Sequence, residues 1–263
     1  MKEILIAVAV VGGTGLVFGC LLAFASMIFY VKQDERVTKI IEVLPGANCG
    51  SCGYAGCGAY AEAVVNGLAP VNGCSVGKGA VAQSIATVMG VEAGAVQDLK
   101  AKVMCAGNYN HAHYKYEYVG INDCLALSKL AGGSKSCPNG CLGMGTCTTV
   151  CQFGAISVQD GVAVVDEEKC TGCGACVRMC PKQVIALIPK DSPIQLNCSN
   201  TEKGAFANKH CSSSCIACRI CERTCTHDAI HVENNLVRVD YEKCVGCGEC
   251  AAKCPHHVIG IRN

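Results

Sequence analysis

The amino-acid sequence predicts an α+β protein in which one membrane helix precedes several small modules held together by metal. Three observations predict this class. A run of 27 residues without a charged side chain, Ile4 to Tyr30, lies near the N-terminus. Cysteine occurs 25 times in 263 residues, and 24 of these cysteines lie outside that run. A cysteine pattern with a period of 74 residues then occurs twice without a gap.

The apolar run predicts a transmembrane helix. At about 1.5 Å per residue it is long enough to cross a hydrocarbon core of about 30 Å. A cleaved signal segment is the alternative, because Ala23-Phe24-Ala25 resembles a signal-peptidase site. The run continues to Val31, however, and the only basic residue before it is Lys2, which stands beside Glu3. Three basic residues follow the run: Lys32, Arg36 and Lys39. This charge asymmetry predicts a single-pass protein of the cytoplasmic membrane, with its C-terminal body on the cytoplasmic side.

The composition limits the kind of core that the rest of the chain can build. Charged residues make up 16% of the chain, aromatic residues 5%, and there is no tryptophan. Small modules with so little aromatic material commonly need metal centres as staples. The net charge of +1 and the lack of a basic run give no indication of a nucleic-acid partner.

Two cysteine runs read C-x2-C-x2-C-x3-C-P. They are Cys170, Cys173, Cys176 and Cys180, followed by Pro181, and Cys244, Cys247, Cys250 and Cys254, followed by Pro255. This is the spacing of bacterial ferredoxins, in which three thiolates hold one [4Fe–4S] cluster and the fourth ligates the neighbouring cluster. Disulfides and structural zinc are the alternatives, but neither favours four cysteines within eleven residues.

Ligand sharing between the paired runs predicts four clusters in two ferredoxin modules. In the second module the sets are Cys215, Cys218, Cys221 and Cys254, and Cys225, Cys244, Cys247 and Cys250. In the first module Met144 stands where the repeat has Cys218. The sets assigned there are Cys137, Cys141, Cys147 and Cys180, and Cys151, Cys170, Cys173 and Cys176. A three-iron cluster at the irregular first set is an open alternative.

A further site is expected nearer the membrane. Cys49, Cys52, Cys57 and Cys74 read C-x2-C-x4-C-x16-C, with zinc as the alternative to a [4Fe–4S] cluster. Five clusters are therefore expected. The remaining four cysteines are Cys105, Cys124, Cys198 and Cys211. They predict a sixth cluster, buried structural thiols or another metal site, and we interpret the nearby His111 and His113 as solvated loop residues.

These patterns divide the chain into four parts. Residues 1–31 form the transmembrane anchor, 32–100 a small, mainly helical [4Fe–4S] domain, 101–190 the first ferredoxin module and 191–263 the second. In each module an alternating apolar pattern around a turn predicts a β-hairpin, over residues 156–165 and 230–239.

The order of these motifs resembles the B subunit of the Rnf complex, the ion-translocating ferredoxin:NAD⁺ oxidoreductase, in its long, cluster-rich form. The resemblance covers essentially the whole chain, although Met144 departs from the ligand pattern. It implies a subunit that accepts electrons from reduced ferredoxin and passes them to membrane subunits, which couple NAD⁺ reduction to Na⁺ or H⁺ export.

Hydride chemistry is expected elsewhere in such a complex, because the chain has no G-x-G-x-x-G before a helix. The expected role is therefore electron transfer with no catalytic residue in this chain. Two other functions remain open. One is a polyferredoxin subunit of a hydrogenase or quinone-linked reductase, and the other is a cluster-bearing redox sensor.

Overall fold

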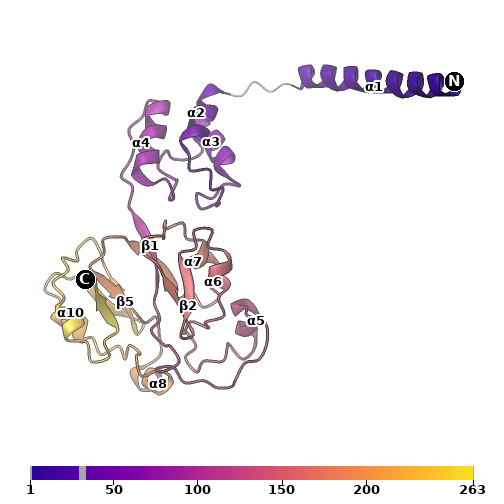
Figure 1. Ribbon diagram of the computed structural model, residues 1–263. Helices are drawn as coiled ribbons and strands as arrows, with labels where there is room; N and C mark the ends of the chain where they lie inside the picture. The colour runs from indigo at the N-terminus through magenta and orange to yellow at the C-terminus, as the bar shows by residue number, and fades with distance from the viewer. Residues whose placement is uncertain (1, 30–33, 263) are drawn as a thin grey trace.

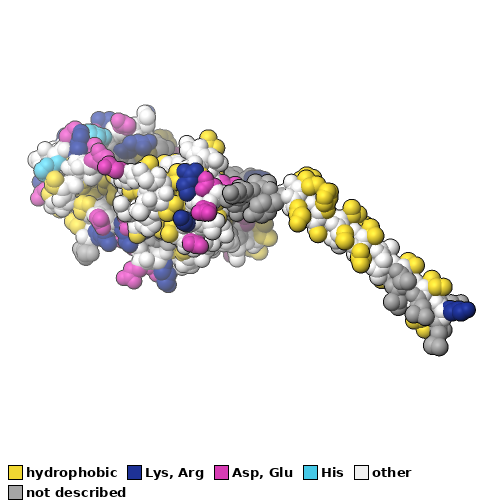
Figure 2. Space-filling model, turned by 90° about the horizontal axis from the view of Figure 1, so that it is seen from above, with side chains coloured by type: hydrophobic (Ala, Val, Ile, Leu, Met, Phe, Trp, Pro, Cys, Tyr) yellow, Lys and Arg dark blue, Asp and Glu magenta, His cyan; other side chains and the backbone are white. Residues whose placement is uncertain are grey.

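The computed structural model describes residues 2–29 and 34–262. Helix α1 spans Lys2–Ile28 and projects away from the rest of the molecule (Figure 1). Apolar side chains face outward along much of this helix, as the space-filling view shows (Figure 2). Phe18, Leu22 and Phe24 are 65%, 71% and 64% exposed. The expected N-terminal apolar helix is thus confirmed, while Tyr30, Val31 and Lys32 lie outside the described residues.

The polar side chains of α1 bond to their own helix. Thr14 Oγ1 donates to the Val10 carbonyl oxygen at 2.9 Å, and Ser26 Oγ donates to the Ala23 carbonyl oxygen at 2.9 Å. Because hydrocarbon offers no hydrogen bonds, such internal bonds let a helix expose these residues to lipid. The stretch Val10–Ile28 is long and apolar enough to span a membrane.

Three helices form the small domain after the anchor: α2 Glu35–Val43, α3 Cys57–Val65 and α4 Lys78–Met89. Asp34 caps α2 by accepting a bond from the Arg36 amide at 2.9 Å, and Gly90 ends α4 with a left-handed φ of 66°. Ile40, Tyr60 and Ile85 are the centre of the core. This domain therefore has an aliphatic and aromatic core of its own.

Each ferredoxin module contains two antiparallel two-stranded sheets. The strands of the first are β1 Leu99–Val103, β2 Ile156–Gln159, β3 Val162–Val165 and β4 Ile185–Pro189. Those of the second are β5 Ile194–Leu196, β6 Ile230–Glu233, β7 Leu236–Val239 and β8 Ile259–Ile261. The hairpins β2–β3 and β6–β7 have the predicted register, with Ile156 opposite Val165 and Ile230 opposite Val239. Their turns contain positive φ angles, 47° at Asp160 and 50° at Asn234.

Short helices connect these strands. They are α5 Cys124–Lys129, α6 Thr146–Thr149, α7 Ala175–Met179, α8 Gly204–His210, α9 Ile220–Thr224 and α10 Glu249–Ala252. Buried cysteines share the cores with aliphatic residues: Cys147 and Cys176 lie with Ile185 in the first module, and Cys221 and Cys250 lie with Ile230 in the second. Thiols are therefore part of the core of each module.

Strands β1 and β5 were not predicted, and they correct the alignment of the two modules. β1 pairs with β4, and β5 pairs with β8. Just beyond these pairs, the Met104 amide donates to the Val184 carbonyl at 2.7 Å, and the Asn197 amide donates to the Val258 carbonyl at 2.8 Å. The two equivalent acceptors are 74 positions apart in the sequence, but the two equivalent donors are 93 apart, so the first module carries 19 additional residues after its first strand. The structural counterpart of Cys198 is therefore Cys105.

Candidate iron–sulfur sites

All 25 cysteines are free thiols, and 24 of them form six groups of four. We number these sites by their order through the molecule. Site 1 is Cys49, Cys52, Cys57 and Cys74; site 2 is Cys151, Cys170, Cys173 and Cys176; site 3 is Cys124, Cys141, Cys147 and Cys180. Site 4 is Cys105, Cys137, Cys198 and Cys211; site 5 is Cys215, Cys218, Cys221 and Cys254; site 6 is Cys225, Cys244, Cys247 and Cys250.

Site 1 lies in the loops of the helical domain. Asn48 Oδ1 accepts a bond from the Cys57 amide at 2.8 Å and so holds the start of α3 at the site. The Gly77 amide donates to Cys74 Sγ at 3.4 Å. Burial, and then the charges of the neighbouring Cys57 and Cys49 thiolates, raise the pKa of Cys74. The thiols of Cys49 and Cys57 thus lie near that of Cys74.

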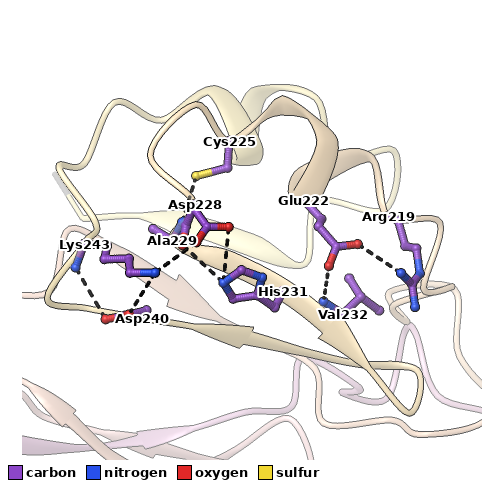
Figure 3. Close-up of polar contacts among 9 residues, drawn as sticks. All are labelled: Arg219, Glu222, Cys225, Asp228, Ala229, His231, Val232, Asp240 and Lys243. Atoms are coloured by element: carbon purple, nitrogen blue, oxygen red, sulfur yellow. Dashed lines mark hydrogen bonds and ion pairs between the residues drawn. The ribbon is translucent and has the colours of Figure 1, made fainter.

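Sites 5 and 6 are each four cysteines around one cavity, in the groups that ligand sharing predicts. The surrounding polar contacts of the second module hold the loops in place (Figure 3). The Ala229 amide donates to Cys225 Sγ at 3.4 Å, and Glu222 Oε1 accepts from the Val232 amide at 3.0 Å. The ion pair between Lys243 and Asp228, at 2.9 Å, joins the two loops that carry site 6.

Site 2 occupies the regular half of the first module. Burial, and then the thiolate charges of Cys173, Cys170 and Cys151, raise the pKa of Cys176 to about 11. The Ala101 amide of β1 donates to Cys170 Sγ at 3.3 Å. The first strand of the module is thus bonded directly to a ligand sulfur.

Gly172 allows strand β1 to lie against the loop that carries Cys170 and Cys173. Its φ is 72°, and a Cβ at this position would lie closer to the Leu99 carbonyl oxygen than van der Waals contact allows. Because backbone cannot yield as a side chain does, Gly172→Ala should cost about 1–3 kcal/mol beyond the left-handed strain. The matched control is Gly154→Ala, with a φ of 59° and open space around its Cβ. Anaerobic thermal unfolding should separate the variants, and equal midpoints would contradict the expectation.

The structure corrects the ligand set of the irregular site. Cys124, and not Cys137, lines the cavity with Cys141, Cys147 and Cys180. Burial, and then the thiolate charges of Cys141 and Cys124, raise the pKa of Cys147 to about 12. Thr146 Oγ1 accepts from the Cys124 amide at 2.6 Å and donates to Asp123 Oδ1 at 2.8 Å. This pair of bonds holds α5, within the additional residues, where Cys124 supplies the thiol that Met144 lacks.

Cys137 instead lies with three cysteines that the spacing left unassigned. Burial, and then the neighbouring thiolates of Cys105, Cys198 and Cys211, raise its pKa to about 12. The sequence prediction grouped Cys124 with these three, and the structure exchanges it for Cys137. The nearby His111 and His113 are exposed, and His111 Nδ1 lies 2.9 Å from Ser212 Oγ.

The cavities at sites 3 to 6 fit a common occupant. Each is a small cavity lined by the four cysteines of its site. Within residues 2–29 and 34–262, no three His, Cys, Asp or Glu side chains are close enough to hold a single metal ion. A zinc ion needs sulfurs about 2.3 Å from the metal, whereas a four-iron cluster holds its cysteines further apart. Four thiols around a cavity of this kind fit a [4Fe–4S] cluster better than a single zinc ion.

Family models agree with this interpretation. A model described as "Putative Fe-S cluster" matches residues 44–76, and one described as "4Fe-4S binding domain" matches residues 163–186 and 237–260. The apolar helix, the four-thiol sites and these matches define a membrane-associated electron-transfer protein that carries [4Fe–4S] clusters.

The chain is 45% identical over 244 residues to the B subunit of the Na⁺-translocating ferredoxin:NAD⁺ oxidoreductase complex of Acetobacterium woodii, covering 92% of this chain and 73% of that protein. It belongs to the family of B subunits of ion-translocating oxidoreductase complexes, the Rnf complexes, and is an electron-transfer subunit. It is 43% identical to the corresponding subunit of the proton-translocating complex of Clostridium ljungdahlii over 91% of this chain and 85% of that protein. It is 39% identical to that of Methanosarcina acetivorans over 92% and 93%.

Proposed function

We propose that this chain accepts electrons from reduced ferredoxin on the cytoplasmic side of the membrane and delivers them to membrane subunits that couple NAD⁺ reduction to Na⁺ or H⁺ export. One observation carries the proposal: the four-thiol sites form a series from the domain beside the membrane helix to the exposed Cys247. Bound [4Fe–4S] clusters would supply one-electron carriers at these sites.

Side-chain and backbone contacts support the continuity of this series. Ser51 Oγ, beside site 1, donates to the Cys173 carbonyl oxygen of site 2 at 2.5 Å and lies 2.7 Å from Ser75 Oγ. The helical domain therefore contacts the first ferredoxin module at the ligands themselves. Sites 2 and 3 share one core, in which Cys176 and Cys147 are both buried.

The chain also supplies the environment that adjusts reduction potentials. Backbone amides donate to ligand sulfurs at several sites, as Ala155 does to Cys151 at 3.3 Å and Ala229 to Cys225 at 3.4 Å. Such bonds stabilise the more negative, reduced form of a cluster, while burial in apolar surroundings destabilises it. The reduction potential at each site would therefore depend on the balance between amide hydrogen bonds to sulfur and burial.

A basic segment that runs from the end of the first module into the second offers a surface on which an acidic ferredoxin could dock. The sequence between residues 169 and 225 has eight basic and three acidic residues. Arg219 and Arg223 are exposed beside site 5, and Val245 is 63% exposed beside Cys247. Lys182 belongs to the same basic group but is half-buried and donates to the Pro138 carbonyl oxygen at 2.7 Å, so it has a structural role.

Ion translocation is assigned to other subunits. Helix α1 has no ionisable side chain from Ile4 to its end at Ile28 apart from the thiol of Cys20. An ion path across a membrane needs polar or charged groups that face a cavity, and one such helix offers none. Arg36 and Lys39 follow the anchor and support a cytoplasmic position for the body.

Charge reversal tests the docking of ferredoxin. Arg223→Glu should lower the second-order rate of reduction by ferredoxin about tenfold at low salt and much less at high salt, because electrostatic steering is screened. Anaerobic stopped-flow absorbance at several ionic strengths measures this rate. Lys129→Glu is the matched control, since Lys129 is exposed on α5 and lies outside the basic segment.

The salt dependence separates steering from structural damage. Arg223 Nη2 also donates to the Cys218 carbonyl oxygen at 3.4 Å, and loss of that bond would slow reduction equally at all salt concentrations. A rate ratio that does not vary with salt would contradict docking at this surface. Failure of reduced ferredoxin to reduce the native protein at all would contradict the proposed function.

A further inference from the structure

Site 4 draws its cysteines from both ferredoxin modules. Cys105 and Cys137 belong to the first module, and Cys198 and Cys211 belong to the second. An antiparallel bridge pairs Cys105 directly with Cys198, and another pairs Ala112 with Cys211. These cysteines lie outside the segments that the family models match.

The four thiols are related by the internal repeat. Cys105 and Cys198 each follow the first strand of their module, and Cys137 and Cys211 are 74 positions apart. The hydrogen bonds repeat as well. The Cys141 amide donates to Cys105 Sγ at 3.4 Å, and the Cys215 amide donates to Cys198 Sγ at 3.3 Å. Each module thus contributes the same half-site, and the two half-sites face each other.

The cavity is surrounded by hydrogen-bond donors that lack acceptors. Asn200 and Ser214 line it and are each 2% exposed, and Asn200 Nδ2 and Ser214 Oγ have no partner in the described part of the chain. The orientation of Asn200 is fixed, because its Oδ1 accepts from the Glu202 amide at 3.1 Å. Buried donors without acceptors cost stability unless an occupant of the cavity accepts from them.

A buried positive charge also lines the cavity. Lys135 is 1% exposed and donates to the carbonyl oxygens of Gly107 and Gly161, at 2.6 and 2.8 Å. Among residues 2–29 and 34–262 it has no carboxylate within 4.0 Å. A buried ammonium group requires a compensating negative charge. Four cysteine thiolates around an iron–sulfur core carry a net negative charge and would supply it.

We infer that site 4 binds a sixth [4Fe–4S] cluster, held by Cys105, Cys137, Cys198 and Cys211 between the two ferredoxin modules. Its cavity is lined by four cysteines, as are the cavities of sites 3, 5 and 6. The thiols, the two orphaned donors and Lys135 together favour an anionic, sulfur-rich occupant. Zinc and an empty thiol pocket are the competing outcomes.

The position of site 4 gives this cluster a role. The amide bonds described above run from Cys141 of site 3 to Cys105 and from Cys215 of site 5 to Cys198, so ligand residues of neighbouring sites are in direct contact. A cluster at site 4 would therefore lie between sites 3 and 5 and bridge the boundary between the two modules.

Iron analysis of the full-length, anaerobically purified protein tests this inference. Six clusters correspond to about 24 iron atoms and five to about 20. Cys198→Ala and Cys105→Ala should each remove about four iron atoms with an equal amount of acid-labile sulfide, and the double variant should lose no more than either single one. Cys20→Ala is the matched control, because this thiol lies in α1 and belongs to no site.

The outcomes separate the interpretations. Loss of about four irons in both single variants, with no further loss in the double variant, supports a shared cluster at site 4. An unchanged iron content in Cys198→Ala, or one zinc per chain that disappears with this thiol, would overturn it. If the variants fail to fold, the iron content of the native protein decides, since about 24 supports the inference and about 20 overturns it.

Discussion

Removal of iron should unfold the two ferredoxin modules while the small helical domain keeps part of its structure. A structural metal site contributes on the order of 10 kcal/mol, comparable with the whole stability of a domain, about 5–15 kcal/mol. In the modules, buried thiols are part of the core and the sheets have only two strands each. The helical domain buries Ile40, Tyr60 and Ile85 in a core with no fully buried cysteine, and its cysteines Cys52, Cys57 and Cys74 pack against the edge of that core. Anaerobic chelation should therefore affect the two parts differently.

Hydrogen exchange with peptide resolution measures this difference. Amides of β2, β3, β6 and β7 should lose their protection after iron removal, whereas amides of α2 and α4 should keep a measurable part of theirs. Protein carried through the same anaerobic steps without chelator is the control. Persistent protection of both hairpins in iron-free protein would show that the modules fold on their aliphatic residues alone.

Glu167→Ala should cause the largest loss of stability among substitutions that leave every cysteine in place. Lys100 Nζ lies 2.6 Å from Glu167 Oε2, and the side chain of Lys100 is 0% exposed. Glu167 also accepts from Gln195 Nε2 at 2.9 Å and lies 3.7 Å from Arg262 Nε, so it joins the two modules. Removing it leaves a buried ammonium group unpaired, which costs about 3 kcal/mol.

The expected shift in anaerobic thermal unfolding is about 6 to 12 °C downward for a chain of this size. Glu168→Ala is the matched control, because the neighbouring carboxylate is exposed and makes no ion pair within the described residues. Glu167→Gln should lie between the two, since it keeps a hydrogen-bond acceptor for Lys100 but loses the charge. A midpoint for Glu167→Ala equal to that of Glu168→Ala would contradict the assigned role.

The pH dependence of the Glu167 contact follows from its pKa. Burial raises that pKa, but the hydrogen bonds from Lys100 and Gln195 and the charges of Lys100 and Arg262 outweigh burial, so the pKa is lowered. A lowered folded-state pKa adds stability above the unfolded pKa of the carboxyl, and this contribution is lost as the pH falls through the folded value. The difference between native protein and Glu167→Gln should therefore shrink in acid.

The sequence was most informative where ligand spacing is local. The C-x2-C-x2-C-x3-C-P runs place three ligands within one loop and helix turn, so the groups at sites 2, 5 and 6 could be predicted from spacing alone. Hairpins β2–β3 and β6–β7 were equally predictable from Asp160-Gly161 and Asn234-Asn235.

Site 3 and site 4 could not be predicted in this way, because their ligands are brought together by β1, β5 and α5. A gap-free shift of 74 residues placed Cys124 on Cys198, although the strand hydrogen bonds make Cys105 its counterpart. One signal was present in the sequence: Cys105 and Cys198 each come two residues after a short strand that alternates apolar and polar residues, Leu99–Val103 and Ile194–Leu196. An alignment of the two modules that allowed an insertion would pair Cys105 with Cys198.

Because site 4 takes its cysteines from both modules, it can be completed only after both modules have been synthesised. During translation Cys105 and Cys137 leave the ribosome well before Cys198 and Cys211, so the nascent first half presents only two of the four thiols. Cofactor delivery to this position must wait until the second half has emerged and docked. Independent maturation of the two halves, by contrast, suffices for the positions whose cysteines all come from one half.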